Sequence, residues 1–143
     1  MNRRAAYGAI SLVVLAACAS LSAQSRAPFC ITSGLGASLL HRHALTLATG
    51  TEAEVVANRA RYMLTATTPD SVVVVNDEAV CQRAAQAYAR AAGDADTMNV
   101  APVALVRYGD SRYLVSDLTP IVGEFAVVAV FDASWTLLAT FAK

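Results

Sequence analysis

The hydrophobic residues change their spacing near residue 100, and this change limits the fold more than any other feature of the sequence. Between residues 51 and 92 they recur mainly at the helical interval of three or four. From residue 103 onward they alternate with other residues at an interval of two, which is typical of strands. The sequence therefore predicts helices first and an antiparallel sheet after them.

Two segments of the first half carry helix signals. Thr51 and Glu54 have the spacing of a Thr-x-x-Glu capping box, which predicts a helix over residues 52–65. Asp77 can cap a second helix that continues to residue 92. Both segments place small or apolar side chains along one face, so we expect both helices to pack on the sheet.

Two strands are predicted in the same half. Val72–Val75 is β-branched and apolar on both faces, which predicts a strand in the interior of the sheet. Residues 39–48 fit a helix face and also a strand face, and we favour a strand over Ala44–Ala48. The stretch Ser33–Ser38 contains two glycines and favours no regular structure.

The second half predicts four strands in succession. A hairpin joins residues 103–108 to 113–116, because Gly109 and Asp110 favour a tight turn. Two further strands follow over residues 125–131 and 135–141. We therefore predict the α+β class, with two helices packed on one face of a mainly antiparallel sheet that ends in a four-stranded meander.

Residues 1–23 have the layout of a secretory signal peptide. Arg3 and Arg4 precede an uncharged stretch over residues 5–17, which is shorter than the roughly 20 apolar residues that a membrane span needs. Small residues follow this stretch. We expect an extracytoplasmic protein that is secreted, periplasmic or anchored to a membrane as a lipoprotein.

Two routes of cleavage stay open. Leu15-Ala16-Ala17-Cys18 resembles a bacterial lipobox, which would make Cys18 a lipidated N-terminus and the anchor to a membrane surface. Cleavage by an ordinary signal peptidase, at Ala17-Cys18-Ala19 or after the stretch that ends at Ala23, would instead remove Cys18 and release a soluble protein. We expect contact with a membrane only through a lipid on Cys18.

The two remaining cysteines form an even pair in an oxidising compartment. Cys30 and Cys81 are therefore predicted to form a disulfide. Neither has the Cys-x-x-Cys spacing that is typical of redox-active cysteines. This bond would staple the N-terminal segment, residues 24–50, which is otherwise predicted to be flexible, onto a single α+β domain over residues 51–143.

The charge of the mature chain argues against nucleic acid as a partner. Without Arg3 and Arg4, nine basic and eleven acidic side chains remain, a net charge of about −2. The nine cations are scattered, and Lys143 is the only lysine. Binding to phosphates needs clustered cations, so we expect no nucleic-acid partner.

His41 and His43 are the residues best suited to catalysis or metal binding. Two imidazoles at this spacing are weak candidates for a metal site, because zinc needs three or four converging ligands and the neighbouring sequence supplies no carboxylate or cysteine. We therefore expect no metal and no cofactor. An extracytoplasmic hydrolase or a metal-binding protein that uses these histidines is the competing hypothesis, so whether the protein is an enzyme stays open.

The aromatic residues of the predicted sheet suggest a binding surface. If one face of the sheet is left uncovered by helices, Tyr108, Arg112 and Tyr113 around the first hairpin could contact a protein, a peptide or a small ligand. We therefore predict a non-catalytic binding or accessory module of the cell envelope. A lipid-anchored structural envelope protein is a third hypothesis.

Overall fold

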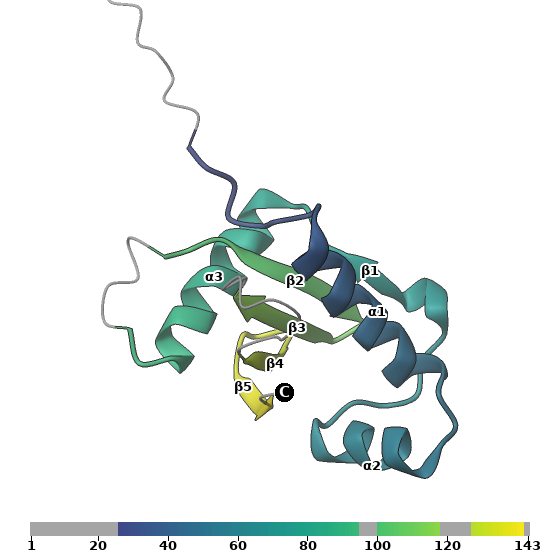
Figure 1. Ribbon diagram of the computed structural model, residues 1–143. Coiled ribbons are helices and arrows are strands. Elements are labelled where there is room, and N and C mark those ends of the chain that lie inside the picture. Colours follow the sequence, from purple (N-terminus) through teal and green to yellow (C-terminus); the bar gives the residue numbers. More distant parts are fainter. Residues whose placement is uncertain (1–25, 95–99, 118–126, 142–143) are drawn as a thin grey trace, which may run out of the picture.

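The computed structural model describes residues 26–94, 100–117 and 127–141 (Figure 1). Within these ranges it contains three α-helices, a short 3-10 helix and a five-stranded sheet. In chain order the elements are α1 (Leu35–Thr49), α2 (Ala53–Arg61), η1 (Pro69–Ser71), β1 (Val72–Val74), α3 (Glu78–Ala91), β2 (Val103–Tyr108), β3 (Arg112–Asp117), β4 (Val128–Asp132) and β5 (Leu137–Phe141). The predicted α+β class is confirmed. The predicted signal peptide and Cys18 lie outside the described residues.

The sheet is antiparallel throughout, with its strands in the order β1-β2-β3-β4-β5. Strands β2 to β5 form the predicted four-stranded meander. The prediction of an interior strand at Val72–Val75 was wrong, because among the described strands β1 lies at an edge and pairs with β2 alone. The valine run is apolar on both sides for another reason: Val72 packs into the core on one face of the sheet, and Val75 packs on the other.

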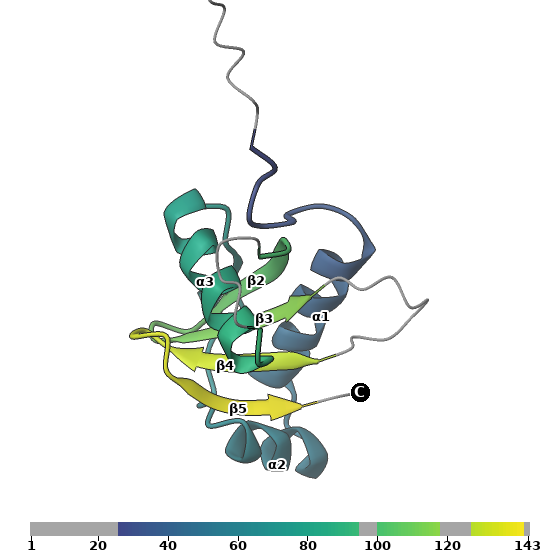
Figure 2. The ribbon, with the colours of Figure 1, turned by 90° about the vertical axis from the view of Figure 1, so that its left-hand side faces the viewer.

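Helices cover both faces of the sheet. In Figure 2, α3 crosses in front of the strands and α1 lies behind them. The two predicted helices correspond to α2 and α3. Val55 of α2 belongs to the core beside α1 and Cys81 of α3 to the core on the other face, so the prediction that these helices share one face was wrong. The reason is visible in β2, where four consecutive side chains, Val103 to Val106, are buried and so both faces need a cover.

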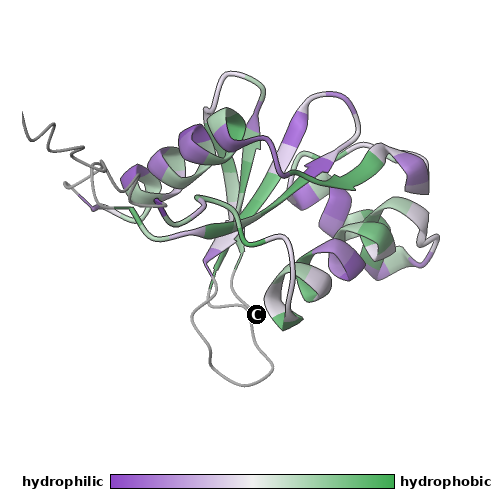
Figure 3. Cartoon of the chain, turned by 90° about the horizontal axis from the view of Figure 1, so that it is seen from above, coloured by the Kyte–Doolittle hydropathy of each residue, from purple (hydrophilic) through white to green (hydrophobic). Residues whose placement is uncertain are grey.

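Each helix buries its own core against the sheet. On the face covered by α1, here called the α1 face, the core includes Leu40, Leu47, Val106, Tyr108, Leu114 and Val130. On the opposite side, here called the α3 face, it includes Cys81, Ala84, Leu105, Val115, Ala129 and Phe131. Figure 3 shows the strands largely hydrophobic, whereas the helices carry hydrophilic and hydrophobic residues on different sides. The alanines of α3 allow this helix to lie close to the strands.

Helix α1 replaces the predicted strand at Ala44–Ala48. Leu40, Ala44 and Leu47 follow at helical spacing, and each is at most 1 % exposed. The predicted irregular stretch over residues 33–38 is corrected too, because the helix begins at Leu35. The sequence of this segment fits a helix and also a strand, and burial of its apolar face against the sheet stabilises the helix. The domain core thus begins before residue 51.

The two predicted helices are both present, and their ends differ in one case. Asp77 caps α3 as expected, and its side chain accepts a hydrogen bond of 2.9 Å from the Val80 N–H. Helix α2 has no side-chain cap and ends at Arg61, four residues earlier than predicted. Met63 follows it with φ of 55°, a left-handed conformation that stops the helix. None of the described helices is long and apolar enough to cross a membrane.

Candidate functional site

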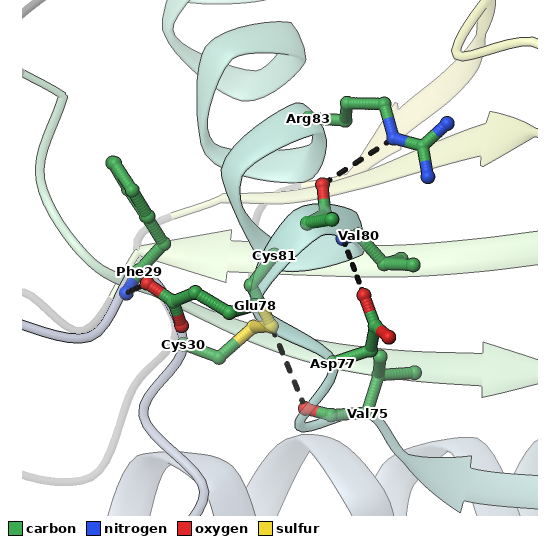
Figure 4. Close-up of a disulfide and its surroundings, with 9 residues drawn as sticks. Phe29, Cys30, Val75, Asp77, Glu78, Val80, Cys81 and Arg83 are labelled. Carbon is green, nitrogen blue, oxygen red and sulfur yellow. Dashed lines mark hydrogen bonds between the residues drawn. A yellow bond between two sulfur atoms is a disulfide. The ribbon is translucent and has the colours of Figure 1, made fainter.

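The predicted disulfide between Cys30 and Cys81 is present (Figure 4). It joins the first turn of α3 to the N-terminal segment around Cys30. This segment pairs with β2 at Val103, on the same side of β2 as β1. In that segment the Ile31 N–H donates to the Val103 carbonyl at 2.9 Å, and the Val103 N–H donates to the Phe29 carbonyl at 2.8 Å. The Phe29 N–H also donates to Glu78 Oε1 at 3.2 Å. The bond therefore fixes the start of α3 over the sheet.

One row of side chains crosses the α3 face beyond the start of this helix. Cross-strand pairing joins its members from β1 to β5, so they are direct neighbours across the whole sheet. We call this set the cross-sheet row, and its members are Val73, Arg107, Tyr113, Phe131 and Leu137. Val73 and Leu137 are 40 % and 41 % exposed, Arg107 is exposed and Tyr113 is half-buried. Phe131 is 1 % exposed and belongs to the α3-face core, so the row is open to solvent at its other four positions.

Trp135 adds an indole ring to the cross-sheet row. Its ring stacks on Tyr113 with centroids 4.7 Å apart and lies tilted toward Phe131 at 6.1 Å. Trp135 has φ of 64°, a left-handed conformation that costs a residue other than glycine about 1–2 kcal/mol. The chain therefore keeps a bulky ring on this face at a position where glycine would fit the backbone better.

Asp132 fixes the turn that presents Trp135. Its Oδ1 accepts hydrogen bonds from the Ser134 N–H at 2.8 Å, the Ser134 hydroxyl at 2.7 Å and the Thr136 N–H at 2.9 Å. The hydrogen bond from Ser134 and that from Thr136 hold the pKa of this carboxyl below its ordinary value. The charged carboxylate thus organises the β4–β5 turn under the indole.

A hollow of about 270 Å³ lies where β1, β2 and β3 meet the start of α3. Its walls combine four valines, three from the β1 segment and one from α3, with polar groups at the rim. The lining residues are Val73, Val74, Val75, Asn76, Asp77, Val80, Arg107 and Tyr113. The hollow and the cross-sheet row share three residues and therefore form one continuous surface.

Arg107 gives this surface its positive charge. In the part of the chain that the structure describes, its guanidinium has no hydrogen bond or ion pair, although Val73 and Tyr113 flank it in the neighbouring strands. The other charged group of the hollow is Asp77, whose carboxylate already accepts the Val80 N–H. The arrangement can bind an anionic group at Arg107 beside an apolar group on the valines.

The structure brings together only one of the three residues predicted for a binding surface. Tyr113 lies in the hollow. Tyr108 was predicted wrongly, because it is 2 % exposed on the α1 face and its hydroxyl donates to the Leu47 carbonyl at 3.2 Å. Burial raises the pKa of Tyr108. Arg112 lies away from the hollow and donates from Nε to the Met63 carbonyl at 3.2 Å, so it ties the first hairpin to the end of α2.

The two histidines both lie on α1. His41 Nε2 donates to the Val72 carbonyl at 3.1 Å, and the ring of His43 lies 5.4 Å from that of Phe141. Among the described residues, no group of three or more His, Cys, Asp or Glu side chains lies close enough to hold a metal ion. The geometry of the two histidines thus suits contacts within the fold.

A second polar cluster lies at the far end of α3. The Tyr88 hydroxyl donates to the Val127 carbonyl at 3.2 Å. Burial and the nearby charge of Asp117 raise the pKa of Tyr88 to about 12. Tyr88 thus links α3 to Asp117 at the end of β3 and to Val127 just before β4, which is a structural role.

Two features of the surface escaped the sequence analysis. Arg107 interrupts a strand that is otherwise apolar, and it shares a face with Val103 and Leu105, which is a signal that the alternation of strand residues could have revealed. Trp135 gave no comparable signal, because its left-handed backbone depends on the turn around Asp132.

Comparison with protein-family models, curated proteins and solved structures gives no match to this chain.

Proposed function

We propose that this chain is a non-catalytic binding or accessory module of the cell envelope, and that it binds its ligand through the cross-sheet row and the adjoining hollow. The observation that carries this proposal is the exposed guanidinium of Arg107, which lies between Val73 and Tyr113 at a concave place on the sheet. Convergent apolar and charged groups in a hollow are the usual features of a binding site.

The strained conformation of Trp135 supports the same surface. A left-handed backbone at a residue other than glycine persists where the surroundings enforce it, and such residues cluster at functional sites. Here the left-handed backbone keeps an indole stacked on Tyr113, which lines the hollow. Tryptophan and tyrosine are enriched at protein interfaces because they bury a large apolar area and keep a polar group.

The disulfide supports a place outside the cytoplasm. Disulfides persist in oxidising compartments, and the bond between Cys30 and Cys81 fixes the helix that forms one wall of the hollow. Export through the leader, and the choice between a soluble form and a lipid on Cys18, are part of the proposal. Mass spectrometry of the native N-terminus tests both: a diacylglyceryl group on Cys18 supports anchoring, and an unprocessed Met1 contradicts export.

Site-specific photocrosslinking tests the binding surface. The photoreactive residue p-benzoylphenylalanine replaces either Val73 in the cross-sheet row or Val56 on α2, which are 40 % and 47 % exposed and provide a matched pair. We expect a defined adduct from position 73 in living cells and none from position 56. Identical products from both positions, or none from position 73, would contradict the proposal.

A hydrolase that uses His41 or His43 is the rival function. Replacement of both histidines by alanine, with hydrolytic activity and crosslinking measured on the same protein, separates the two. The binding module predicts that the crosslink from position 73 persists, since both side chains lie on α1. Loss of a hydrolytic activity that the unaltered protein shows would instead support the enzyme.

A further inference from the structure

We propose that the hollow binds an extended peptide segment in which an apolar residue and an acidic residue are separated by one residue. The inference rests on the proposed function and names the ligand of the same site. Three properties of the surface lead to it: the charge of Arg107, the size of the hollow and the direction of the backbone groups of β1.

The charge selects an acidic group. Arg107 is exposed and has no acceptor among the described residues, and its cross-strand neighbours are Val73 and Tyr113. A carboxylate that pairs with a guanidinium through two parallel hydrogen bonds forms one of the stronger hydrogen-bonded pairs in proteins. Asp77 at the opposite end of the hollow repels a second carboxylate there. The acidic residue therefore belongs at the Arg107 end.

The size of the hollow selects a small apolar group. At about 270 Å³ it lies below the range of roughly 300–1,000 Å³ that holds whole drug-sized ligands. Val75 and Val80 form its apolar walls near the start of α3. The hollow thus suits a single aliphatic side chain that belongs to a larger molecule lying across its rim.

The edge of β1 supplies the backbone groups that an extended peptide needs. The Val75 N–H donates to the Leu105 carbonyl and the Gly109 N–H donates to the Ser71 carbonyl, so these alternate residues face β2. The backbone groups of Val72 and Val74 therefore point away from β2. The Val72 carbonyl already accepts a hydrogen bond from His41. An added strand would therefore pair with the backbone N–H and carbonyl of Val74.

Together, the three properties determine the separation between the acidic and the apolar residue of the peptide. Residues i and i+2 of a strand lie on the same face, so peptide residues beside Val73 and Val75 both face the hollow. The residue beside Val73 lies on the same rung of the sheet as Arg107 and carries the carboxylate. The residue beside Val75 enters the hollow. The peptide residue between them pairs with Val74.

The experiment is a titration with short peptides, read by the fluorescence of Trp135, the single tryptophan of the chain. The first probe is an end-blocked hexapeptide of threonine with leucine at position two and glutamate at position four, used on the purified protein with its disulfide intact. Matched probes carry glutamine at position four, or place leucine and glutamate side by side, or carry N-methyl groups on residues two to four. The same probe with leucine and glutamate exchanged covers the reverse direction of the strand.

We expect the glutamate peptide, in one of its two directions, to bind about tenfold more tightly than its glutamine version, the effect of losing a hydrogen bond to a charged group. Arg107→Gln should remove this difference, whereas Arg90→Gln, an equal loss of charge at the other end of α3, should preserve it. The N-methylated and side-by-side peptides should bind more weakly. Equal binding of the glutamate and glutamine peptides overturns the inference. If no peptide binds but the crosslink from position 73 forms, the inference fails and the proposed function stands.

Discussion

Removal of the disulfide is the change whose effect on stability can be calculated most directly. The bond closes a loop of 51 residues between Cys30 and Cys81. In the chain-entropy model, a loop of this length stabilises the folded state by about 4 kcal/mol, because the cross-link restricts the unfolded chain. Small domains have unfolding free energies of roughly 5–15 kcal/mol, so this bond supplies a large share of the total.

The double variant Cys30→Ala with Cys81→Ala should lose about 4 kcal/mol, together with a further cost from the volume removed at two buried positions. Reduced wild-type protein keeps the sulfur atoms and isolates the effect of the cross-link. The assay is equilibrium unfolding in urea, where loss of the cross-link should also increase the dependence of the free energy on urea. A difference below about 1 kcal/mol between oxidised and reduced protein would refute the chain-entropy reasoning.

Three further predictions concern local features. Met63→Gly should raise the unfolding free energy by about 0.5–1 kcal/mol in urea, because Met63 is 55 % exposed and has a left-handed backbone; a loss of stability would contradict this reading of the α2 end. Asp77→Ala should cost about 1 kcal/mol through loss of the α3 cap, and Asp77→Asn should recover most of it; an equal cost for both would contradict the capping role. The raised pKa of Tyr88, about 12, stabilises the fold fully below pH 10, and this contribution is lost as the pH rises from 10 toward 12, since the unfolded chain releases the proton first. Tyr88→Phe should therefore flatten the fall of the urea midpoint between pH 9 and pH 11, and an unchanged slope would contradict the assignment.

The sequence predicted those parts of the fold that local signals control. Asp77 identified the start of α3, and the turn at Gly109 identified the hairpin of β2 and β3, because caps and tight turns depend on a few neighbouring residues. Helix α1 was missed because its residues suit either period, and contacts with distant strands decide between them. The edge position of β1 also depends on pairing that no local pattern records.

The site was predicted only in part for a related reason. Tyr113 and Tyr108 are both aromatic residues of the first hairpin, yet they lie on opposite faces of the sheet. Which face stays open depends on where α3 begins, and the disulfide at Cys81 fixes that place. The sequence therefore identified the hairpin as a candidate binding site but could not show which of its two faces is exposed.

Chemical labelling tests most directly whether the cross-sheet row is occupied in the native setting of the protein. Single cysteines at Val73→Cys and Val56→Cys provide a matched pair of exposed positions for maleimide labelling. The rate of labelling is measured in intact cell envelopes and again in purified protein. If a ligand occupies the row, labelling at position 73 should be several-fold slower in envelopes than in purified protein, with no change at position 56. Equal rates at position 73 in the two settings would contradict occupancy of the row.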